Sequence, residues 1–247
     1  MMFVSDLDHT LIYSKRDLNG EKAVPVEYIG EKPITYMTPQ ALELYWSLRT
    51  NSNFMFTPCT LRDYDQTMRI SIIHDFLPKF MICENGGRLY VNGKEDTDYR
   101  QYILNTFDLY LETARKMMED APCTIKDDQT FLTCIFKNSD EAAAWAIRKI
   151  PILSDFDFDL QHRKFYIIPK GLDKSVGLSY LIKNYGVKNL VTSGDGMVDR
   201  KFTKMGAHIF LPNHAVFSHS FAYVSKSEGV KAGEEILEQV VKLLERN

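Results

Sequence analysis

The stretch that decides the fold is Met2-Phe3-Val4-Ser5-Asp6-Leu7-Asp8-His9-Thr10, a short apolar run that ends in an acidic turn. The run has the length and composition of a buried strand. Acidic residues two apart on a continuing strand would face opposite sides, but a turn that begins at Asp6 brings Asp6 and Asp8 toward one pocket. In open α/β sheets, ligands bind at this carboxyl edge. Taken alone, the pair is equally compatible with a helix-capping aspartate followed by a surface one.

A second acidic motif, read with the first, favours a cation-binding role for both. Two carboxylates ~4 Å apart repel by roughly 4 kcal/mol at an effective dielectric constant of about 20, so they need a shared proton or a cation. Ser193-Gly194-Asp195-Gly196-Met197-Val198-Asp199 also follows an apolar run, and its glycines permit a tight turn from strand to helix. Asp195 would then begin a helix, and Asp199 would lie one turn later. Because Mg²⁺ prefers oxygen ligands and keeps several waters, the two motifs together favour a Mg²⁺ site.

The two ends of the chain share one pattern, in which strands and helices alternate. This order is typical of a parallel sheet covered by helices, as in α/β proteins. The predicted strands cover residues 2–5, 53–56, 80–83, 189–192 and 208–211, and the predicted helices cover residues 40–49, 61–76, 173–185 and 232–244.

The middle of the chain repeats the order helix, strand, strand, which favours an antiparallel sheet with helices on one face. We therefore expect an α+β domain over residues 87–168, inserted into a core formed by residues 1–86 and 169–247. The predicted elements are helices over 98–119 and 139–150, the second capped by Ser139, and strands over 123–125, 131–136, 156–160 and 165–168.

Composition narrows the class of protein. The 247 residues suffice for one large domain or a domain with an insert, and 45% hydrophobic and 26% charged residues are ordinary for a globular protein. A net charge of -3 gives no general attraction to nucleic acid or anionic membrane. No apolar run approaches the ~20 residues that span a bilayer. Four scattered cysteines without a CxxC pair, and an N-terminus unlike a signal peptide, favour a cytoplasmic protein. The sequence predicts no oligomeric state.

Two further residues become candidates because of their position after predicted strands or at a helix start. Thr57 closes the strand at residues 53–56, where its hydroxyl can bind a phosphate oxygen or cap the next helix. Lys174 lies at a helix start, an unfavourable place for a cation with respect to the helix dipole. It is either solvated or suited to holding a carboxylate and a phosphate together.

In order, Asp6-Leu7-Asp8-His9-Thr10, Thr57, Lys174 and Gly194-Asp195-Gly196-Met197-Val198-Asp199 resemble the four motifs of the haloacid-dehalogenase superfamily. The insert resembles the α/β cap of its branch of sucrose-, trehalose- and mannosylglycerate-phosphate phosphatases, Cof-type proteins and eukaryotic phosphomannomutases. The resemblance implies a Rossmann-like core with an inserted cap that decides the substrate.

The resemblance also implies roles for residues. Asp6 would be the nucleophile, Asp8 the general acid and base, and Thr57 and Lys174 the groups that bind the phosphoryl group. Mg²⁺ would be held by Asp6, the Asp8 main-chain carbonyl and Asp195, with Asp199 supporting it directly or through water.

Weaker candidates for substrate binding are Thr10, Arg62, Asn85 and Arg163. Thr10 belongs to the first motif and, with Asp8, favours phosphoryl transfer over dehalogenation. Arg62 can replace an arginine that relatives often carry just after the threonine of the second motif, but a solvated helix residue is equally compatible. Asn85 resembles a hinge residue that faces substrate, with a plain turn as the alternative. Arg163 lies between two predicted cap strands, where a charged hairpin is usually only solvated.

The expected function is a Mg²⁺-dependent phosphatase that acts on a small phosphate monoester, with sugar phosphates favoured, through an aspartyl-phosphate. Two alternatives stay open at this point. A phosphomutase would use the same aspartyl-phosphate to return the phosphoryl group to substrate. A non-catalytic protein that binds a phosphorylated ligand would have a decayed site, against which the presence of Asp6, Asp8, Lys174 and Asp195 argues.

Overall fold

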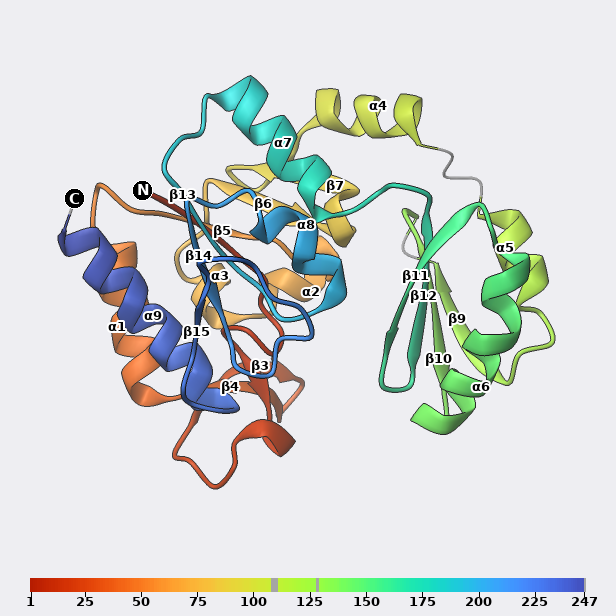
Figure 1. Ribbon diagram of the computed structural model, residues 1–247, viewed down its shortest axis with the longest axis horizontal. Helices are drawn as coiled ribbons and strands as arrows, with labels where there is room; N and C mark the ends of the chain where they lie inside the picture. The colour runs from red at the N-terminus through yellow and green to blue at the C-terminus, as the bar shows by residue number, and fades with distance from the viewer. Residues whose placement is uncertain (108–110, 128, 247) are drawn as a thin grey trace. The chain divides into compact units, whose positions relative to one another are not determined.

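The computed structural model describes residues 1–107, 111–127 and 129–246. The chain divides into two compact units (Figure 1). The first unit comprises Met1–Asp96 and Lys174–Asn247, and the second comprises Thr97–Asp173. Residues 87–96, which the sequence assigns to the insert, belong to the first unit. There β7 (Arg88–Val91) pairs with β6 (Phe80–Cys83), and β8 (Lys94–Glu95) pairs with β7. Residues 169–173, which the sequence assigns to the core, belong to the second unit.

The first unit is built around a parallel sheet with the strand order β15-β14-β13-β1-β5. Every pairing in this sheet is parallel, as the sequence predicts. Its central strands are short and apolar because both faces are covered, and Phe3 and Val4 have no exposed surface. The five strands are β1 (Met2–Ser5), β5 (Met55–Pro58), β13 (Leu190–Ser193), β14 (His208–Leu211) and β15 (Tyr223–Val224).

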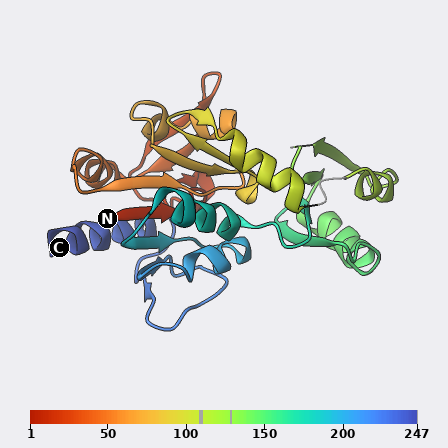
Figure 2. The ribbon, with the colours of Figure 1, turned by 90° about the horizontal axis from the view of Figure 1, so that it is seen from above.

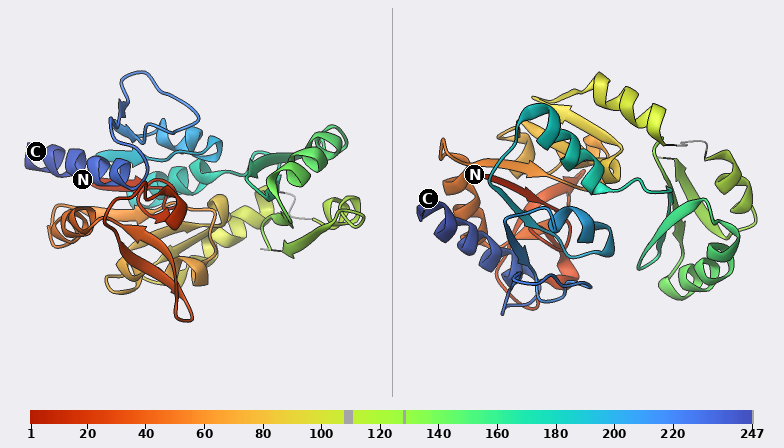
Figure 3. Two further views of the ribbon diagram at one scale, coloured as in Figure 1. Left: turned by 90° about the horizontal axis from the view of Figure 1, so that it is seen from below. Right: turned by 45° about the horizontal axis from the view of Figure 1, so that its top comes forward.

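Helices cover the two faces of this sheet. The helices α1 (Pro39–Arg49) and α9 (Val230–Glu245) pack against each other on one side, while α7 (Lys174–Tyr185) and α8 (Arg200–Thr203) lie on the other (Figures 1 and 3). Thr38 caps α1, because its hydroxyl oxygen accepts a hydrogen bond of 3.0 Å from the N–H of Ala41.

The predicted single helix over residues 61–76 is wrong. The segment forms two short helices, α2 (Tyr64–Met68) and α3 (Ser71–His74), which are separated at Ile70. Ile70 has an extended backbone and makes a β-bridge to Glu27, so a pairing with a distant strand overrides the helical spacing of the sequence.

A hairpin that the sequence analysis did not predict follows the first motif. It consists of β3 (Val24–Ile29) and β4 (Lys32–Met37), with β2 (Tyr13–Ser14) paired to the other edge of β4. The hairpin extends from the body of the first unit in Figure 2, where it is coloured red to orange. Its inner side packs onto the segment around α3.

The second unit has the predicted α+β architecture. Its antiparallel sheet has the order β11-β12-β10-β9, and the helices α5 and α6 cover one face (Figure 1). A separate apolar cluster, which includes Leu132, Phe165 and Ile167, holds the helices to the sheet. The elements are α4 (Thr97–Thr106), α5 (Glu112–Met117), β9 (Cys123–Asp127), β10 (Leu132–Phe136), α6 (Ser139–Lys149), β11 (Phe156–Gln161) and β12 (Lys164–Pro169).

The helices of the second unit can be compared with those expected from the sequence at two places. Residues 98–119 hold α4 and α5, and the predicted helix between them crosses residues 108–110, which lie outside the described part of the chain. The cap of α6 is Asn138, not Ser139, because the Asn138 side chain accepts the N–H of Glu141 at 2.9 Å. Among the helices that the structure describes, none combines the length and apolar character needed to cross a bilayer.

Candidate active site

Three of the predicted site residues, Asp6, Thr57 and Asp195, meet at the carboxyl edge of the parallel sheet. Asp6 directly follows β1, Asp195 follows β13, and Thr57 lies inside β5. The register of the sheet pairs Ser5 with Ser193 and Val4 with Thr57, so these three strands end level with one another. Because neighbouring parallel strands point the same way, their ends deliver all three side chains to one edge.

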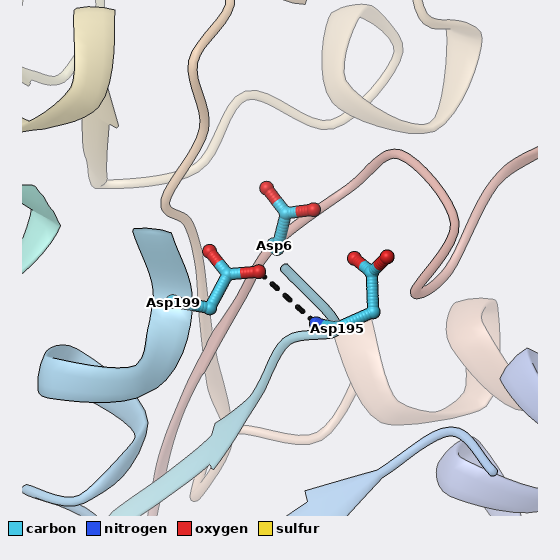
Figure 4. A group of neighbouring side chains, drawn as sticks. All are labelled: Asp6, Asp195 and Asp199. Atoms are coloured by element: carbon cyan, nitrogen blue, oxygen red, sulfur yellow. Dashed lines mark hydrogen bonds between the residues drawn. The ribbon is translucent and has the colours of Figure 1, made fainter. Parts of the chain in front are cut away.

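Three carboxylates form the centre of this site. Oxygen atoms of Asp6, Asp195 and Asp199 lie within 4.8 Å of one another. Figure 4 shows the three side chains around one common space, with Asp6 on the loop after β1, Asp195 on the loop after β13 and Asp199 on the helical segment that follows that loop. Asp199 ends a short 3-10 helix, η4 (Met197–Asp199), and is almost fully buried. The sequence predicted this grouping from the two acidic motifs.

Lys174 supplies the positive charge. It is the first residue of α7, and its side chain has no exposed surface. Its Nζ donates to Asp6 Oδ1 at 2.5 Å and to Asp199 Oδ1 at 2.6 Å. Burial alone would lower the pKa of this lysine, but the adjacent Asp199 and Asp6 outweigh burial and raise it. The lysine therefore stays charged and links the two acidic motifs.

Asp199 also shapes the loop that carries Asp195. Its Oδ2 accepts hydrogen bonds from the N–H groups of Asp195 at 3.0 Å and Gly196 at 2.9 Å. The loop comes so close that a Cβ on Gly194 would lie 2.5 Å from the Cβ of Asp199. Position 194 therefore requires glycine because of this close approach.

The charge balance of the site fits a divalent cation. Burial raises the pKa of Asp6 to about 7, with Asp199 and Asp8 adding to the effect and Lys174 opposing it. Burial, together with Asp199 and Asp6, raises the pKa of Asp195 well above its usual value. Three clustered carboxylates exceed the charge of one lysine, and hard oxygen ligands of this kind are those that Mg²⁺ prefers. The donor set is therefore suited to a magnesium ion.

The carboxylate of Asp8 pairs with Arg62. The guanidinium donates from Nε to Asp8 Oδ2 and from Nη2 to Asp8 Oδ1, both at 2.7 Å. Arg62 also contacts Glu27, and its side chain is only 11% exposed. Arg62 is therefore not a solvated helix residue, and the structure excludes that alternative.

The two threonines of the site differ in their contacts. The Thr10 hydroxyl donates to Asp195 Oδ1 at 3.1 Å and so joins the first acidic motif to the second. The Thr57 hydroxyl is buried, and no residue in the described part of the chain forms a hydrogen bond with it. A buried polar atom without a partner carries a free-energy cost, which a bound ligand can relieve.

The remaining two candidates, Asn85 and Arg163, belong to different units. Asn85 is buried in the short 3-10 helix η2 (Glu84–Gly86), where it has a left-handed φ of 55° and donates its N–H to the Thr60 carbonyl at 3.0 Å. Arg163 belongs to the second unit and lies at the turn between β11 and β12, with Nη1 3.5 Å from the Phe136 carbonyl oxygen.

Sequence reasoning missed Glu27, which binds Arg62 from the β3–β4 hairpin. A signal for the hairpin exists, since Val24, Val26 and Tyr28 alternate with other residues before Gly30-Glu31, a two-residue turn. Nothing in that alternation marks Glu27 as inward-facing.

Comparisons with known proteins agree with this architecture. No family model matches the sequence, and a search of curated proteins finds no significant match. Solved structures do match over nearly the whole chain. The sucrose-phosphatase of Synechocystis, solved with sucrose and phosphate, has a TM-score of 0.68 at 14% identity and covers 98% of this chain and 97% of its own.

Two further structures give the same result. The C-terminal domain of the C. albicans trehalose-6-phosphate phosphatase has a TM-score of 0.66 at 12% identity, covering 98% of this chain and 91% of its own. A sugar phosphatase of haloacid-dehalogenase subclass IIB has a TM-score of 0.65 at 13% identity, covering 98% of both chains. The protein has the fold of the haloacid-dehalogenase-like hydrolases, which confirms the expected fold.

Proposed function

We propose that this protein is a Mg²⁺-dependent phosphatase that hydrolyses a small phosphate monoester through an aspartyl-phosphate on Asp6. The observation that carries the proposal is the position of Asp6. Its carboxylate lies at the edge of the sheet, within reach of the charged Lys174 and beside two further carboxylates. A carboxylate held in this way is an oriented nucleophile, and carboxylates of this kind form covalent phosphoryl intermediates.

In the first half-reaction, a carboxylate oxygen of Asp6 attacks phosphorus. The bond between phosphorus and the ester oxygen breaks, and its electron pair goes to that oxygen. The oxygen takes a proton from the carboxyl group of Asp8 and leaves as an alcohol. Asp6 then carries the phosphoryl group, and Asp8 is a carboxylate. This assigns general acid catalysis to Asp8, two residues from the nucleophile.

In the second half-reaction, water attacks the phosphorus of the aspartyl-phosphate. Asp8 takes one proton of the water, and the bond between phosphorus and the Asp6 oxygen breaks. Inorganic phosphate leaves, Asp6 returns as a carboxylate, and Asp8 is protonated for the next cycle. The same residue therefore acts as acid in one step and as base in the other.

Binding of the phosphoryl group falls to Thr57 and Lys174. The buried Thr57 hydroxyl lies in the strand β5 and has no hydrogen-bond partner among the described residues, and the Lys174 ammonium lies 2.5 Å from Asp6. Most of the acceleration of phosphoryl transfer comes from positioning and from stabilising charge on the phosphoryl oxygens. These two groups supply a hydroxyl donor and a positive charge for that purpose.

Magnesium would be held by Asp6, Asp195 and the main-chain carbonyl of Asp8. When bound, the ion neutralises the repulsion between nucleophile and phosphate and so supplies electrostatic stabilisation of the transferring group. Lys174 and two backbone N–H groups already occupy the oxygens of Asp199. This favours a supporting contact of Asp199 with the ion through water.

We assign sugar phosphates as the favoured substrate class. The support is the fold similarity to structures described as sucrose-phosphatase, trehalose-6-phosphate phosphatase and sugar phosphatase. The inserted unit would be the cap that selects the leaving group, and Thr10, Asn85 and Arg163 stay our candidates for substrate binding. Free cysteines in the described chain agree with a reducing compartment such as the cytoplasm.

The experiment is phosphate release from a panel of phosphorylated sugars, nucleotides and cofactors, with Mg²⁺ and with EDTA. We expect metal-dependent release from a few sugar phosphates. Release of no phosphate, with transfer of the group between positions of a sugar, would indicate a mutase. Tight binding without either reaction would indicate a binding protein.

The variant Asp6→Asn tests the covalent step directly. It removes the nucleophile with little change of volume, so we expect loss of turnover by more than about 10³-fold and a circular dichroism spectrum like that of the wild type. Asp75→Asn, at an exposed aspartate that pairs with the neighbouring His74, is the matched control and should keep full activity. Full activity of Asp6→Asn would contradict the mechanism.

A further inference from the structure

An irregularity in β3 turns an acidic side chain toward the interior. The pairing of β3 with β4 runs from Pro25 opposite Tyr36 to Glu27 opposite Thr35, and the register shifts on both sides of Glu27. Regular alternation would bury only one of two successive residues, yet Val26 and Glu27 are both buried. A β-bulge re-aims a side chain in this way and recurs beside functional sites.

Donors surround the buried carboxylate of Glu27, whose side chain is 1% exposed. Arg62 donates from Nη1 to Oε1 at 2.8 Å and from Nη2 to Oε2 at 3.0 Å. The Thr35 hydroxyl donates to Oε2 at 3.1 Å, and Arg69 Nε donates to Oε1 at 3.3 Å. A buried carboxylate without such partners would cost several kcal/mol, so these contacts compensate for the burial of Glu27 and fix its side chain.

Arg62 uses two edges of its guanidinium for two carboxylates. The edge of Nη1 and Nη2 binds Glu27, while the edge of Nε and Nη2 binds Asp8. The remaining N–H, on Nη1, donates to the Gln66 carbonyl at 3.2 Å. All five donors of the planar group are thereby used, so its orientation is determined by the protein.

We propose that Glu27 is a positioning residue, which acts through Arg62 to hold the carboxyl group of Asp8 in place for proton transfer. This inference rests on the proposed role of Asp8 as general acid and base. The Asp8 side chain is 42% exposed, so packing alone leaves it room to rotate, whereas Arg62 is 11% exposed. The rigid part of the pair is the arginine, and Glu27 is what makes it rigid.

The same contacts change the role of Arg62. An arginine that binds substrate needs N–H groups that face the ligand, and here Asp8, Glu27 and Gln66 accept all five. Arg62 therefore orients the acid and base and does not serve as a primary ligand of the substrate.

Substrates with different leaving groups distinguish a misplaced Asp8 carboxyl group from a general defect of the fold. Departure of an alkyl alcohol needs the proton that Asp8 gives to the ester oxygen as the bond to phosphorus breaks. 4-Nitrophenolate leaves as a stable anion and needs no proton. Misplacement of Asp8 therefore slows phosphorylation by an alkyl phosphate far more than by 4-nitrophenyl phosphate, whereas a fold defect slows both equally.

The experiment is single-turnover kinetics of Glu27→Gln with the best alkyl phosphate of the panel and with 4-nitrophenyl phosphate. We expect phosphorylation of Asp6 to slow by about 10- to 100-fold with the alkyl ester, and by less than about 3-fold with the nitrophenyl ester. Hydrolysis of the aspartyl-phosphate also needs Asp8, so the nitrophenyl ester should give a burst followed by slow turnover.

Glu95→Gln is the matched control. Glu95 binds Arg88 in the same unit at 2.8 Å, in a second arginine–carboxylate pair that does not include Asp8. We expect wild-type rates with both esters. Arg62→Lys, which keeps the charge but not the two-edged contact, is the second variant should Glu27→Gln fold poorly, and it should show the same dependence on leaving group.

A double-mutant cycle tests the path of the effect. In an Asp8→Asn background, Glu27→Gln should slow the alkyl ester no further, because the group that it positions is already lost. Equal slowing with both esters, or slowing that adds fully to that of Asp8→Asn, would overturn the proposal.

A crystal structure of Glu27→Gln gives a readout that does not depend on activity. We expect the Asp8 carboxyl group to lose its two-bond contact with Arg62, and an unchanged contact would overturn the inference. If Asp6→Asn is active, the proposed function fails. If Asp6→Asn is inactive while Glu27→Gln behaves like the wild type, only the present inference fails.

Discussion

At the scale of single residues, the site is a compact arrangement of opposite charges. Lys174 is fully buried and has a carboxylate on each side, at Asp6 and Asp199. Its replacement by a neutral side chain would leave both carboxylates in the interior without the charge that compensates them. Removing one partner of a buried pair costs far more than the pair itself contributes. Lys174 is therefore important for stability, beside its proposed role in binding phosphate.

Lys174→Met tests this at constant volume. We expect the free energy of unfolding, measured by urea denaturation in EDTA, to fall by about 3 kcal/mol. Lys170→Met is the control, because Lys170 is 65% exposed and pairs with Asp157 at 3.2 Å. Lys170→Met should change the free energy of unfolding by less than about 1 kcal/mol. Equal effects of the two variants would show that the buried ion pairs of Lys174 contribute no more to stability than an exposed pair does.

At the scale of elements, the sequence predicts the strands and loops that have a regular local pattern. It does not predict the elements that depend on contacts between distant segments. The strands β1, β6, β13 and β14 follow from apolar runs, and the acidic loops follow from their position after such runs. The β3–β4 hairpin was missed because Pro25 and Pro33 interrupt it, and proline within a run argues against a strand. The β-bulge of the same hairpin then places Glu27 inward, which no local pattern specifies.

The residues of the site show the same division between what is local and what depends on distant contacts. Asp6, Asp195, Asp199 and Lys174 were predicted because each stands in a motif at an element boundary. The sequence does not predict which residue binds the Asp8 carboxylate, because the contact of Arg62 with Asp8 and Glu27 joins three segments that are far apart in the sequence. Pairings of that kind depend on the folded chain and leave no periodic trace in the sequence.

One carboxylate on α9 makes the stability of the first unit depend on pH in the acidic range. Burial pushes the pKa of Glu235 upward, but hydrogen bonds from the Tyr223 hydroxyl and the N–H groups of Lys226 and Ser227 outweigh it and lower the pKa to about 2. The two N–H contacts are both 2.9 Å. The folded state thus binds this proton more weakly than the unfolded state, in which the pKa of the glutamate is 4.5. The contact stabilises the protein above pH 4.5 and is lost as the pH falls toward 2.

Glu235→Gln removes this titration. We expect the variant to be less stable than the wild type by about 1 kcal/mol at pH 7, since the group is partly exposed. The difference should shrink below pH 4.5 and vanish near pH 2. Urea denaturation across this range is the measurement, with Glu238→Gln as the control because Glu238 forms only a long, exposed pair of 3.9 Å with Lys242 among the ion pairs of the described residues. A difference that stays constant with pH would contradict the assignment.

At the scale of the whole molecule, each of the two units has an apolar cluster of its own. Phe3, Phe56 and Ile236 belong to the cluster of the first unit, and Leu132 and Ile167 belong to that of the second. A unit with its own core can unfold by itself, so the protein need not melt in one step.

We expect two transitions in differential scanning calorimetry. Leu132→Ala, which leaves a cavity in the second cluster, should destabilise its unit by about 2–5 kcal/mol and lower the temperature of one transition only. Phe56→Ala should lower the other. A single transition that shifts as a whole with either variant would show that the units unfold together.

The order of the central sheet has a consequence for synthesis on the ribosome. The strand β1 pairs with β5 on one side and with β13 on the other, and β13 is made only after the whole second unit. As the chain emerges from its N-terminus, the second unit is complete while one edge of β1 has no neighbouring strand. An exposed strand edge is a place where other chains attach. The nascent protein therefore carries an open, apolar sheet edge until residues 190–193 emerge, which gives a chaperone a defined period and a defined strand to protect.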